Sequence, residues 1–481
     1  MELTINDILK CTKGSLIIGD ENKICENFSK DTRTINENDT YIGIKGENFD
    51  GSLFWEDAFE KGASTVIIQK IELEPEKIEK YKNQNKNIIQ VDDTKVALEE
   101  MATFKRNMYG DNLIVVGVTG SVGKTSTKDI IANVLSKKYR TLKTEGNNNN
   151  DIGLPLTILK LKNHEAAVIE MGMNHLGEIS KLTRIAKPTI SVITNVGTSH
   201  IGNLGSRENI LKAKLEILEG MKEKIVVINN DNDLLNKWKN ENNDNVKIYT
   251  FGINNKSDCM AEEIFFNEEK SEFICNLMDN KFKLEVPIKG EHFVLNSLCA
   301  SMVGNLCGLN EEEIEDGVRN FSLTKKRMEI SKLEGNVTII NDSYNASFES
   351  MKASIEYLAS TDSARKIAVL GDMFELGEFS EELHRKVGDE IVKNNIDVLF
   401  AIGENAKFIV DEAKVKGFDV NNIFYFETKE GLIGRLKEFF EPGDVVLFKA
   451  SNGMRLFEVM EECLRLMNSE FKKSNSNKGI L

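Results

Sequence analysis

Residues 117–125 read GVTGSVGKT, directly after the apolar run LIVVGV at 113–118 and directly before a helical pattern at 125–139. Glycines at 120 and 123 let the backbone curl so that its N–H groups converge, and the N-terminus of the following helix adds partial positive charge there. The strict phosphate-loop motif has glycine at position 118, where this chain has valine. The strand before the loop and the helix after it nevertheless favour a phosphate-binding loop over an unliganded turn.

The rest of the chain alternates between strand-like and helical segments. Apolar runs at 166–169, 189–194 and 225–229 are separated by helical stretches, which predicts a largely parallel sheet with helices on both faces. A second set of strands from residue 337 onward predicts a Rossmann-like domain, and residues 262–286 resemble a pair of strands. We therefore expect an α/β protein of three domains, with a small α/β domain at 1–110, a central mononucleotide-binding domain at 111–323 and a C-terminal domain at 324–481.

Composition narrows the class of protein. At 481 residues the chain is too long for one core, and no apolar run approaches the roughly 20 residues that span a bilayer. The formal net charge of −15 argues against nucleic-acid binding. Seven scattered cysteines without a C-x-x-C pair, together with an N-terminus that lacks a signal-peptide pattern, predict a cytoplasmic protein with reduced thiols.

Several polar residues after the loop are ambiguous on their own. Glu170 follows a predicted strand, where ligands gather in open α/β sheets, but such a residue is more often structural or solvated. His200 is one of only five histidines and follows a turn. Lys214 within KAKLEI and Asn296 in a helical block have the patterns of solvated helix residues. Their spacing alone therefore assigns them no chemistry.

The order of longer blocks is more specific. The chain resembles the Mur ligase family across nearly its whole length. The blocks that carry this resemblance are DTR (31–33), KGENFDG (45–51), TEGNNNNDIGLPLTIL (144–159), AVIEMGMNHLGEI (167–179), ITNVGTSHIGNLGSRENILKAKLEI (193–217), GEHFVLNSLCA (290–300), KKRMEI (325–330), NDSYNASFESMKAS (341–354), VLGDMFELGEFSEELH (369–384) and VVLFKASNGM (445–454).

The resemblance implies a function. The last four blocks resemble the member that adds D-alanyl-D-alanine to UDP-N-acetylmuramoyl-tripeptide during cell-wall synthesis, with ATP activating the tripeptide carboxylate as an acyl phosphate. It implies ATP and Mg²⁺, with two metal sites, as cofactors, and we expect a monomer. A related ligase that adds another amino acid or D-alanyl-D-serine, and a nucleotide-driven binding module, remain alternatives.

The resemblance also implies roles for single residues. Lys124, Glu170, His200 and Lys214 are expected to be catalytic. Metal ligands are expected at Thr125, Glu170, His200 and Lys214, the last as a carbamate. The residues expected to bind the nucleotide are Gly120, Ser121, Val122, Gly123, Lys124, Thr125, Ser126, Asn296, Arg327 and Asp342. The residues expected to bind the sugar peptide are Thr32, Arg33, Lys45, Gly46, Asp50, Gly51, Asn149 and Asn150.

The chain departs from the family pattern at four places. The family commonly has His where Ser52 stands, Ala where Ser343 stands, Asn-Pro at 347–348 and Gly-Ser-Arg at 450–452. Three of these departures lie in the C-terminal domain, which in the family closes over the nucleotide and presents the incoming amine. We therefore expect an open arrangement without ligands and closure around the nucleotide.

Overall fold

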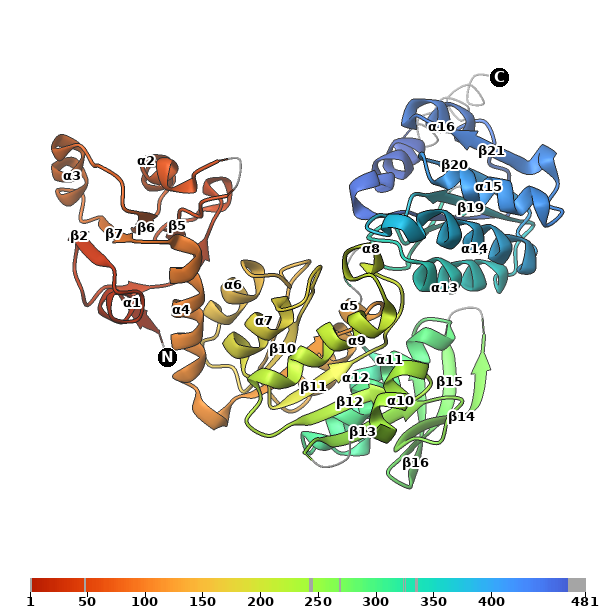
Figure 1. Cartoon of the computed structure of the whole chain (residues 1–481), viewed down its shortest axis with the longest axis horizontal. Coiled ribbons are helices and arrows are strands. Elements are labelled where there is room, and N and C mark those ends of the chain that lie inside the picture. The colour runs from red at the N-terminus through yellow and green to blue at the C-terminus, as the bar shows by residue number, and fades with distance from the viewer. Residues whose placement is uncertain are drawn as a thin grey trace, which may run out of the picture.

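The computed structural model describes residues 2–465 apart from 47–48, 242–244, 268–269, 323, 325 and 334–335. Its strands form a two-stranded ribbon and three larger sheets of five, nine and six strands. Figure 1 shows these sheets in three successive bodies, with the N-terminal and C-terminal bodies standing on either side of the central one. The predicted three-domain α/β architecture is therefore confirmed. Residue 323, at the domain boundary that the sequence predicts, lies outside the described residues, as does Lys325 of the KKRMEI block.

The N-terminal body is a small mixed sheet with helices. Its five strands run in the order β2-β7-β6-β5-β4, with β2 antiparallel to β7 and the other pairs parallel. The elements are β1 (Leu3–Thr4), α1 (Ile5–Thr12), β2 (Ser15–Ile18), β3 (Ile24–Cys25), β4 (Phe28–Ser29), β5 (Thr40–Ile42), α2 (Trp55–Glu60), β6 (Thr65–Gln69), α3 (Pro75–Lys82), β7 (Asn87–Val91) and α4 (Thr94–Asn107).

Helix α4 connects this body to the central one. It begins at a capping residue, Asp93, whose carboxylate accepts hydrogen bonds from the N–H groups of Lys95 (2.7 Å) and Val96 (3.0 Å). Its buried face includes Leu98 and Met101, and the helix packs against α6 and α7 of the central body. The first body is therefore attached to the second through a packed helix (Figure 1).

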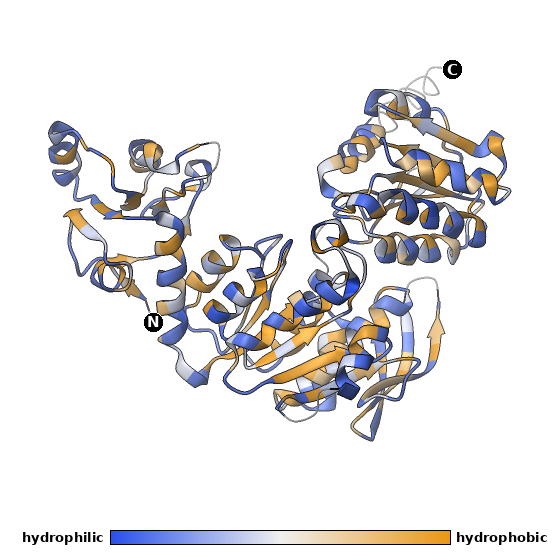
Figure 2. Cartoon of the chain, in the orientation of Figure 1, coloured by the Kyte–Doolittle hydropathy of each residue, from blue (hydrophilic) through white to orange (hydrophobic). Residues whose placement is uncertain are grey.

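The central body is built on the nine-stranded sheet β16-β15-β14-β13-β12-β11-β8-β10-β9. Its pairs from β9 to β14 are parallel, as the sequence predicts. The strands are β8 (Ile114–Thr119), β9 (Thr141–Lys143), β10 (Ala166–Glu170), β11 (Ile190–Ile193), β12 (Ile225–Asn229), β13 (Lys247–Gly252), β14 (Cys259–Phe266), β15 (Ser271–Leu277) and β16 (Asn280–Val286). Figure 2 shows the hydrophobic character of the middle strands of this sheet, and β8, β10, β11 and β12 are almost entirely buried.

The sequence predicts two strands at 262–286, and this number is wrong, because the structure has three antiparallel strands there. A two-residue turn joins β15 to β16, and its residues Met278 and Asp279 both have positive φ. Such turns match the twist of a hairpin, but asparagine or glycine is their usual sequence signal, and neither stands at these two positions. The hairpin extends the sheet at its outer edge, away from the glycine loop.

The helices of the central body cover both faces of its sheet. The helix that follows the glycine loop, α5, packs against α11 and α12. The helices are α5 (Lys124–Leu135), α6 (Gly153–Leu159), α7 (Glu178–Ala186), α8 (Ile201–Leu204), α9 (Arg207–Leu215), α10 (Asp233–Glu241), α11 (Glu291–Leu306) and α12 (Glu311–Arg319).

The C-terminal body has a six-stranded sheet in the order β17-β18-β22-β19-β20-β21. Only the edge strand β17 is antiparallel, which gives the Rossmann-like arrangement that the sequence predicts. The elements are β17 (Glu329–Lys332), β18 (Thr338–Asn341), α13 (Phe348–Ala359), β19 (Arg365–Gly371), α14 (Ser380–Lys393), β20 (Val398–Ile402), α15 (Ala406–Val415), β21 (Ile423–Phe426), α16 (Lys429–Leu436), β22 (Asp444–Lys449) and a last described helix at 456–465.

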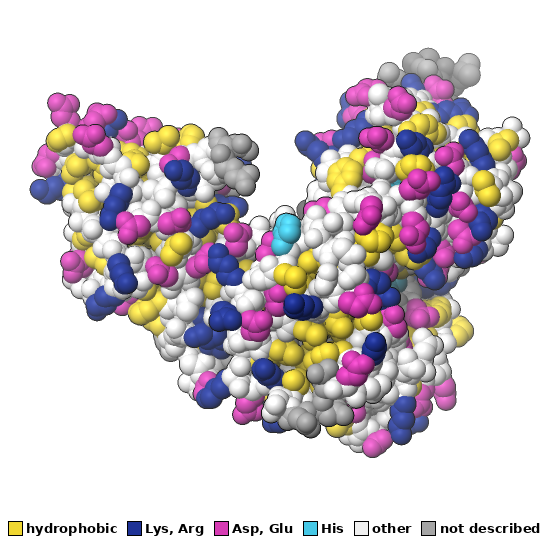
Figure 3. Space-filling model, viewed as in Figure 1, with side chains coloured by type: hydrophobic (Ala, Val, Ile, Leu, Met, Phe, Trp, Pro, Cys, Tyr) yellow, Lys and Arg dark blue, Asp and Glu magenta, His cyan; other side chains and the backbone are white. Residues whose placement is uncertain are grey.

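Two sheets converge on one region. The carboxyl ends of β8 and β10 in the central sheet, and those of β18 and β22 in the C-terminal sheet, lead into residues that line the same two cavities. Figure 3 shows a deep hollow between the N-terminal and C-terminal bodies, above the central one. None of the helices in the described ranges combines the length and the apolar character needed to cross a bilayer.

Candidate active site

The glycine loop lies at the carboxyl end of β8, where residues 120–123 join the strand to the N-terminus of α5. Gly120 has a φ of 154° and Gly123 a φ of 80°, values that favour glycine. A Cβ added at Gly120 would lie 1.9 Å from the hydroxyl oxygen of Thr194, so a side chain cannot fit there. The first N–H groups of α5 therefore open onto a loop of the kind that holds phosphate.

Asn195, which follows β11, supports this loop from the neighbouring strand. Its Oδ1 accepts hydrogen bonds from the N–H groups of Ser121 (3.0 Å) and Val122 (2.9 Å). The Lys124 ammonium folds back and donates to the carbonyls of Gly120 (2.8 Å) and Ser121 (3.3 Å). The sequence analysis missed Asn195, because asparagine after a strand is a common turn residue.

Glu170 ends β10 beside the loop and is only 2% exposed. One of its oxygens, Oε1, accepts a hydrogen bond of 2.8 Å from Asn149 Nδ2. The other, Oε2, is buried and has no hydrogen-bond partner among the described residues. Glu170 also acts on Lys124: burial lowers the pKa of the Lys124 ammonium, and the nearby Glu170 carboxylate partly offsets that effect. A buried carboxylate oxygen without a donor is ready for a cation.

The donor set around Glu170 fits a magnesium ion that completes its shell with phosphate oxygens. Thr125, at the start of α5, is buried, and its hydroxyl oxygen is within 3.2 Å of Arg327 Nη2. Oxygen ligands are those that Mg²⁺ prefers, and protein sites commonly supply only one or two of them. The described part of the chain holds no cluster of three or more His, Cys, Asp and Glu side chains arranged around a metal.

His200 lies on the loop before α8 and has a φ of 64°. Its Nδ1 lies 2.5 Å from Oε2 of Glu375, which belongs to the C-terminal body. The hydrogen bond from His200 is the main reason that the pKa of Glu375 is lowered, although burial opposes it. The carbonyl of Glu375 also accepts a hydrogen bond of 3.0 Å from the Gly202 N–H. The histidine loop is therefore a contact between two bodies.

A second carboxylate from the C-terminal body reaches the same loop. Glu349, in the first turn of α13, accepts hydrogen bonds from the N–H (2.7 Å) and the hydroxyl (3.0 Å) of Thr198. Neither Glu349 nor Glu375 could be predicted from the sequence, since no local pattern connects either residue with a loop more than 150 residues earlier in the chain.

Lys214 lies on α9 beneath the glycine loop and is 1% exposed. Burial lowers the pKa of its ammonium well below the usual value, the charge of Lys124 lowers it further, and Glu349 partly offsets both. No hydrogen-bond or ion-pair partner of Lys214 occurs among the described residues. The solvated role that its spacing suggests is therefore wrong, because Lys214 lies on the buried face of α9 with Ile210 and Ala213.

Asn296 faces the glycine loop from α11. Its Oδ1 accepts a hydrogen bond of 3.0 Å from the Thr127 hydroxyl on α5. The same oxygen would lie 3.3 Å from a Cβ added at Gly123, so the two helices approach closely at this point. Phe251 and Phe293 line the same cavity as Asn296 and give it apolar walls.

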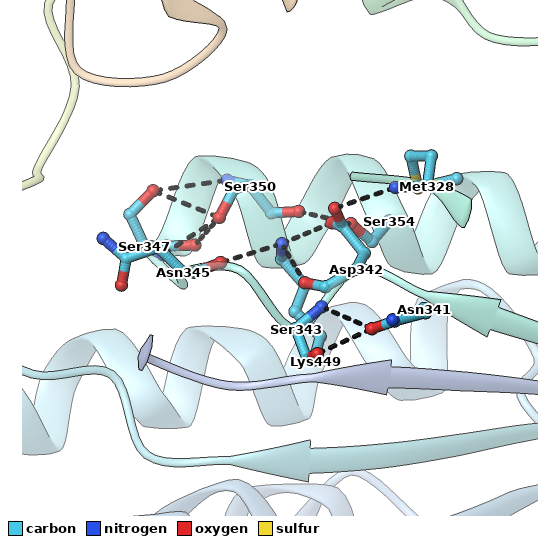
Figure 4. Close-up of polar contacts among 9 residues, drawn as sticks. All are labelled: Met328, Asn341, Asp342, Ser343, Asn345, Ser347, Ser350, Ser354 and Lys449. Carbon is cyan, nitrogen blue, oxygen red and sulfur yellow. Dashed lines mark hydrogen bonds and ion pairs between the residues drawn. The ribbon is translucent and has the colours of Figure 1, made fainter. Parts of the chain in front are cut away.

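Arg327 and Asp342 come from the start of the C-terminal body. The Arg327 guanidinium lies 4.0 Å from the centre of the Tyr344 ring, a cation–π contact, and its Nε is buried without a hydrogen-bond partner among the described residues. Asp342 Oδ2 accepts hydrogen bonds from Lys449 Nζ (2.5 Å) and Ser354 Oγ (2.7 Å), as Figure 4 shows. Burial raises the pKa of Asp342, but Lys449 and these hydrogen bonds outweigh it, so the carboxyl has a lowered pKa.

Two adjoining cavities bring most of the predicted residues together. Both are open to solvent and span about 1040 Å³ and about 1450 Å³, and Lys124, Arg327 and Asn345 line both. Of the predicted residues, the first is also lined by Ser121, Val122, Gly123, Ser126, Asn296 and Asp342. The second is also lined by Asn149, Asn150, Glu170 and His200. Gly120, Thr125 and Lys214 line neither cavity.

The six residues predicted in the N-terminal body line neither cavity. Thr32 and Arg33 form a short 3₁₀ turn, and the Arg33 guanidinium pairs with Asp31 through contacts of 2.6–3.2 Å while its side chain remains 83% exposed. The other four residues are Lys45, Gly46, Asp50 and Gly51, in a loop closed by a bridge between residues 45 and 50. Asp50 caps the next turn by accepting a hydrogen bond of 2.9 Å from the Ser52 N–H.

Ser52, one of the departures from the family pattern, has a structural role in this chain. It is fully buried, its hydroxyl donates to the carbonyl of Gly43 (3.1 Å), and the same oxygen accepts from the N–H of Gln69 (2.9 Å). A histidine is much larger than this site allows. The loop is therefore packed around a small hydroxyl side chain.

Comparison with known proteins agrees with this geometry. Three family models match, described as Mur ligase family, catalytic domain (residues 27–106), Mur ligase middle domain (118–304) and Mur ligase, glutamate ligase domain (326–452). A Bacillus subtilis protein named UDP-N-acetylmuramoyl-tripeptide–D-alanyl-D-alanine ligase is 39% identical over 465 residues, which cover 96% of this chain and 98% of the relative. A Synechocystis protein of the same name is 34% identical, covering 91% of this chain and 92% of the relative.

Solved structures give the same result. MurF from Acinetobacter baumannii has a TM-score of 0.83 at 26% identity, and the match covers 97% of this chain and 99% of the MurF chain. MurF ligase from Thermotoga maritima, solved in complex with ADP, has a TM-score of 0.77 at 29% identity. The match covers 92% of this chain and 98% of the Thermotoga chain. Sequence and fold agree over nearly the whole length, and this chain therefore belongs to the Mur ligase family.

Proposed function

We propose that this chain is the ATP-dependent ligase that joins D-alanyl-D-alanine to UDP-N-acetylmuramoyl-tripeptide, which yields the pentapeptide precursor of peptidoglycan. The observation that carries this proposal is the pair of cavities that share Lys124 and Arg327. A phosphoryl donor in the first cavity then faces a carboxylate in the second. The relatives named above, of which this chain covers more than nine tenths, support the choice of substrates.

The chemistry follows from the weakness of a carboxylate as an acyl donor. A carboxylate oxygen of the tripeptide attacks the γ-phosphorus of ATP, ADP leaves, and an acyl phosphate forms. The neutral amine of the dipeptide then attacks the acyl carbon, and the tetrahedral intermediate collapses with loss of phosphate and a proton. Two anions must be brought together in the first step, so the main tasks of the protein are charge neutralisation and alignment.

The chain supplies cations for the first step. We assign Lys124 to the β and γ phosphates, and Arg327 to the phosphates from the C-terminal side. Arginine suits this role because its planar donors bind oxygens in pairs. Arg327 Nε has no hydrogen-bond partner among the described residues, so it has a donor to offer. We assign Asn296 to the adenine base, which would lie against the apolar wall of the first cavity. We assign Asp342, which lines the same cavity, to the ribose.

Two magnesium sites complete the proposal. The first would be held by Thr125 and Glu170, and the unpaired Glu170 Oε2 supports that assignment. The second would be held by His200 and by Lys214 as a carbamate. When bound, the metal ions supply positive charge that offsets the charge developing on the transferred phosphoryl group.

Carbamylation of Lys214 is supported by its burial. A neutral amine attacks CO₂ and loses a proton, which gives a carboxylate-like group. Burial at 1% exposure without an acidic partner among the described residues favours the neutral amine over the ammonium. Burial of Lys214 therefore favours the neutral amine, which is the form that reacts with CO₂.

The three bodies are assigned separate tasks. We assign residues 1–110 to the UDP-sugar, 111–323 to ATP, and 324–481 to closure over the nucleotide and to the incoming dipeptide. Arg33 and Lys45 would neutralise the diphosphate, with Thr32, Gly46, Asp50 and Gly51 shaping the loops around it, and Asn149 and Asn150 would bind the peptide. We expect the protein to act as a monomer. All seven cysteines are free thiols, which supports a cytoplasmic location.

A product assay tests the function. Purified protein is given ATP, Mg²⁺, UDP-muramoyl tripeptides with lysine or diaminopimelate at position three, and D-alanyl-D-alanine, D-alanyl-D-serine or single amino acids, and products are identified by mass spectrometry. We expect ADP release and a new amide only with a tripeptide and a D,D-dipeptide together. Release driven by a single amino acid would instead assign another ligase reaction, and ATP turnover without a ligated product would contradict the proposal.

A further inference from the structure

Lys449, the last residue of β22, is a buried cation to which the proposed mechanism gives no task. Its side chain is 1% exposed, and it lines the first cavity beside Asp342 and Ser354. Removing an ammonium from water is costly unless partners compensate it. The contacts of Lys449 therefore indicate what it does.

The Lys449 ammonium is saturated by one short segment of the chain. It donates to Asp342 Oδ2 at 2.5 Å, to the carbonyl of Asn345 at 3.2 Å and to the carbonyl of Asp342 at 3.4 Å (Figure 4). An ammonium has three N–H donors, and here three oxygens accept from it. No donor is left for a bound ligand, so Lys449 acts through residues 342–345.

These residues face both cavities. Asp342 lines the first cavity, where its other oxygen, Oδ1, accepts a hydrogen bond of 3.3 Å from the Met328 N–H. Tyr344 lines the second cavity and packs under the guanidinium of Arg327. Asn345 lines both. One turn thus carries a wall of each cavity, and Figure 4 shows it between β18 and α13 with Lys449 beneath it.

We propose that Lys449 is a positioning residue that fixes the turn 342–345, so that the nucleotide contact at Asp342 and the facing wall at Tyr344 and Asn345 are set together. The identity of the nucleotide rests on the proposed function, whereas the three contacts of Lys449 do not. Without the ammonium, two carbonyls lose this donor and the buried carboxylate loses its charged partner, keeping only the hydrogen bonds from Ser354 and Met328, and the turn relaxes.

The main test is a double-mutant cycle on ADP binding, measured by calorimetry on protein without other ligands. We expect Lys449→Met to weaken ADP binding at least tenfold in the wild-type background. In an Asp342→Asn background the same change should cost less than threefold, because Lys449 acts through that carboxylate. Equal losses in both backgrounds, or no loss in either, would overturn the proposal.

Two further variants cover the case in which Lys449→Met does not fold, which thermal unfolding detects. Lys449→Arg keeps the positive charge, but a planar guanidinium cannot place three donors on the oxygens of one turn. We expect the Lys449→Arg variant to fold and to bind ADP at least threefold more weakly than the wild type. An affinity equal to that of the wild type would show that the positive charge alone suffices, and it would refute the positioning role. Ser354→Ala removes only one donor from Asp342 and should have a smaller effect than Lys449→Arg, so a larger effect would contradict the proposal.

A control variant and a kinetic measurement separate this inference from the proposed function. Lys386→Met removes an exposed lysine on α14 and should bind ADP as the wild type does. In steady-state kinetics, Lys449→Arg should raise the KM for both ATP and the UDP-muramoyl tripeptide, because the turn faces both cavities. A change in the KM for ATP alone would contradict the joint role. If wild-type protein bound no ADP, the proposed function would fail, whereas equal binding by wild type and variants would refute only the inference.

Discussion

In the central body, Glu170 and Lys214 are 2% and 1% exposed, whereas in the N-terminal body the side chain of Arg33 is 83% exposed. Bonds from neighbouring strands and helices hold the central loop, as Asn195 holds residues 121 and 122. Among the described residues, the Arg33 side chain is held only by Asp31, two residues away. The loop assigned to the phosphates is therefore held by bonds from other elements, whereas Arg33, assigned to the sugar diphosphate, is a solvated side chain.

This difference in burial predicts that substitutions in the central body mainly affect the chemical step. We expect Lys124→Ala to lower kcat/KM for ligation roughly 10³-fold, or by about 4 kcal/mol of transition-state stabilisation, because one full charge on the transferred phosphoryl group is lost. Product formation by the purified variant measures this. Lys386→Met is the control, and a Lys124→Ala rate within twofold of the wild type would contradict the assignment.

Lys214 offers a second way to test the buried end of the site. We expect Lys214→Met, which is similar in volume, to lower kcat about 100-fold because a metal ligand is lost. Wild-type activity should fall when bicarbonate and CO₂ are removed and recover when they are restored, whereas the residual activity of the variant should not respond. Wild-type activity that is indifferent to bicarbonate would refute the carbamate.

Asn195 tests how much the support of the loop matters. Replacing it with alanine removes the side-chain acceptor that two loop N–H groups share, although the Ser121 N–H still donates to the carbonyl of residue 195. We expect the KM for ATP to rise about tenfold with a smaller change in kcat, as a net loss of one or two hydrogen bonds implies. Titration with ADP provides the direct measurement, and tighter binding would show that Asn195 competes with phosphate instead of shaping the loop.

The smallest effect is expected in the N-terminal body. Arg33→Ala should raise the KM for the UDP-sugar peptide about threefold to fivefold, since an exposed ion pair contributes little and water replaces part of its contact. The KM for ATP and the melting temperature should not change. A fall in kcat as large as that of Lys214→Met would contradict the distinction between the two regions.

The central loop could be predicted from the sequence, because its determinants are local. Gly120 and Gly123 are needed for their own backbone angles, and the strand and helix on either side are visible as periodic patterns. The alternation of strands and helices likewise predicts the parallel sheets. The third antiparallel strand was missed because Met278 and Asp279 form its turn without glycine or asparagine.

The contacts between bodies could not be predicted from the sequence. Glu375 meets His200, and Glu349 meets Thr198, only because the C-terminal sheet packs against one loop of the central body. Lys449 was missed for the same kind of reason, since its partners in residues 342–345 lie in the turn after the neighbouring strand β18, more than 100 residues away along the chain. Such pairs depend on how sheets and strands are placed, and no local spacing encodes that placement.

The fate of one oxygen atom tests most directly whether the two cavities hold a phosphoryl donor and a carboxylate side by side. Tripeptide substrate with both oxygens of its reacting carboxylate replaced by ¹⁸O is ligated to the dipeptide, and the released phosphate is analysed by mass spectrometry. Transfer of the γ-phosphoryl group to the carboxylate predicts one ¹⁸O atom in each phosphate. Phosphate without ¹⁸O, formed together with the ligated product, would contradict the account.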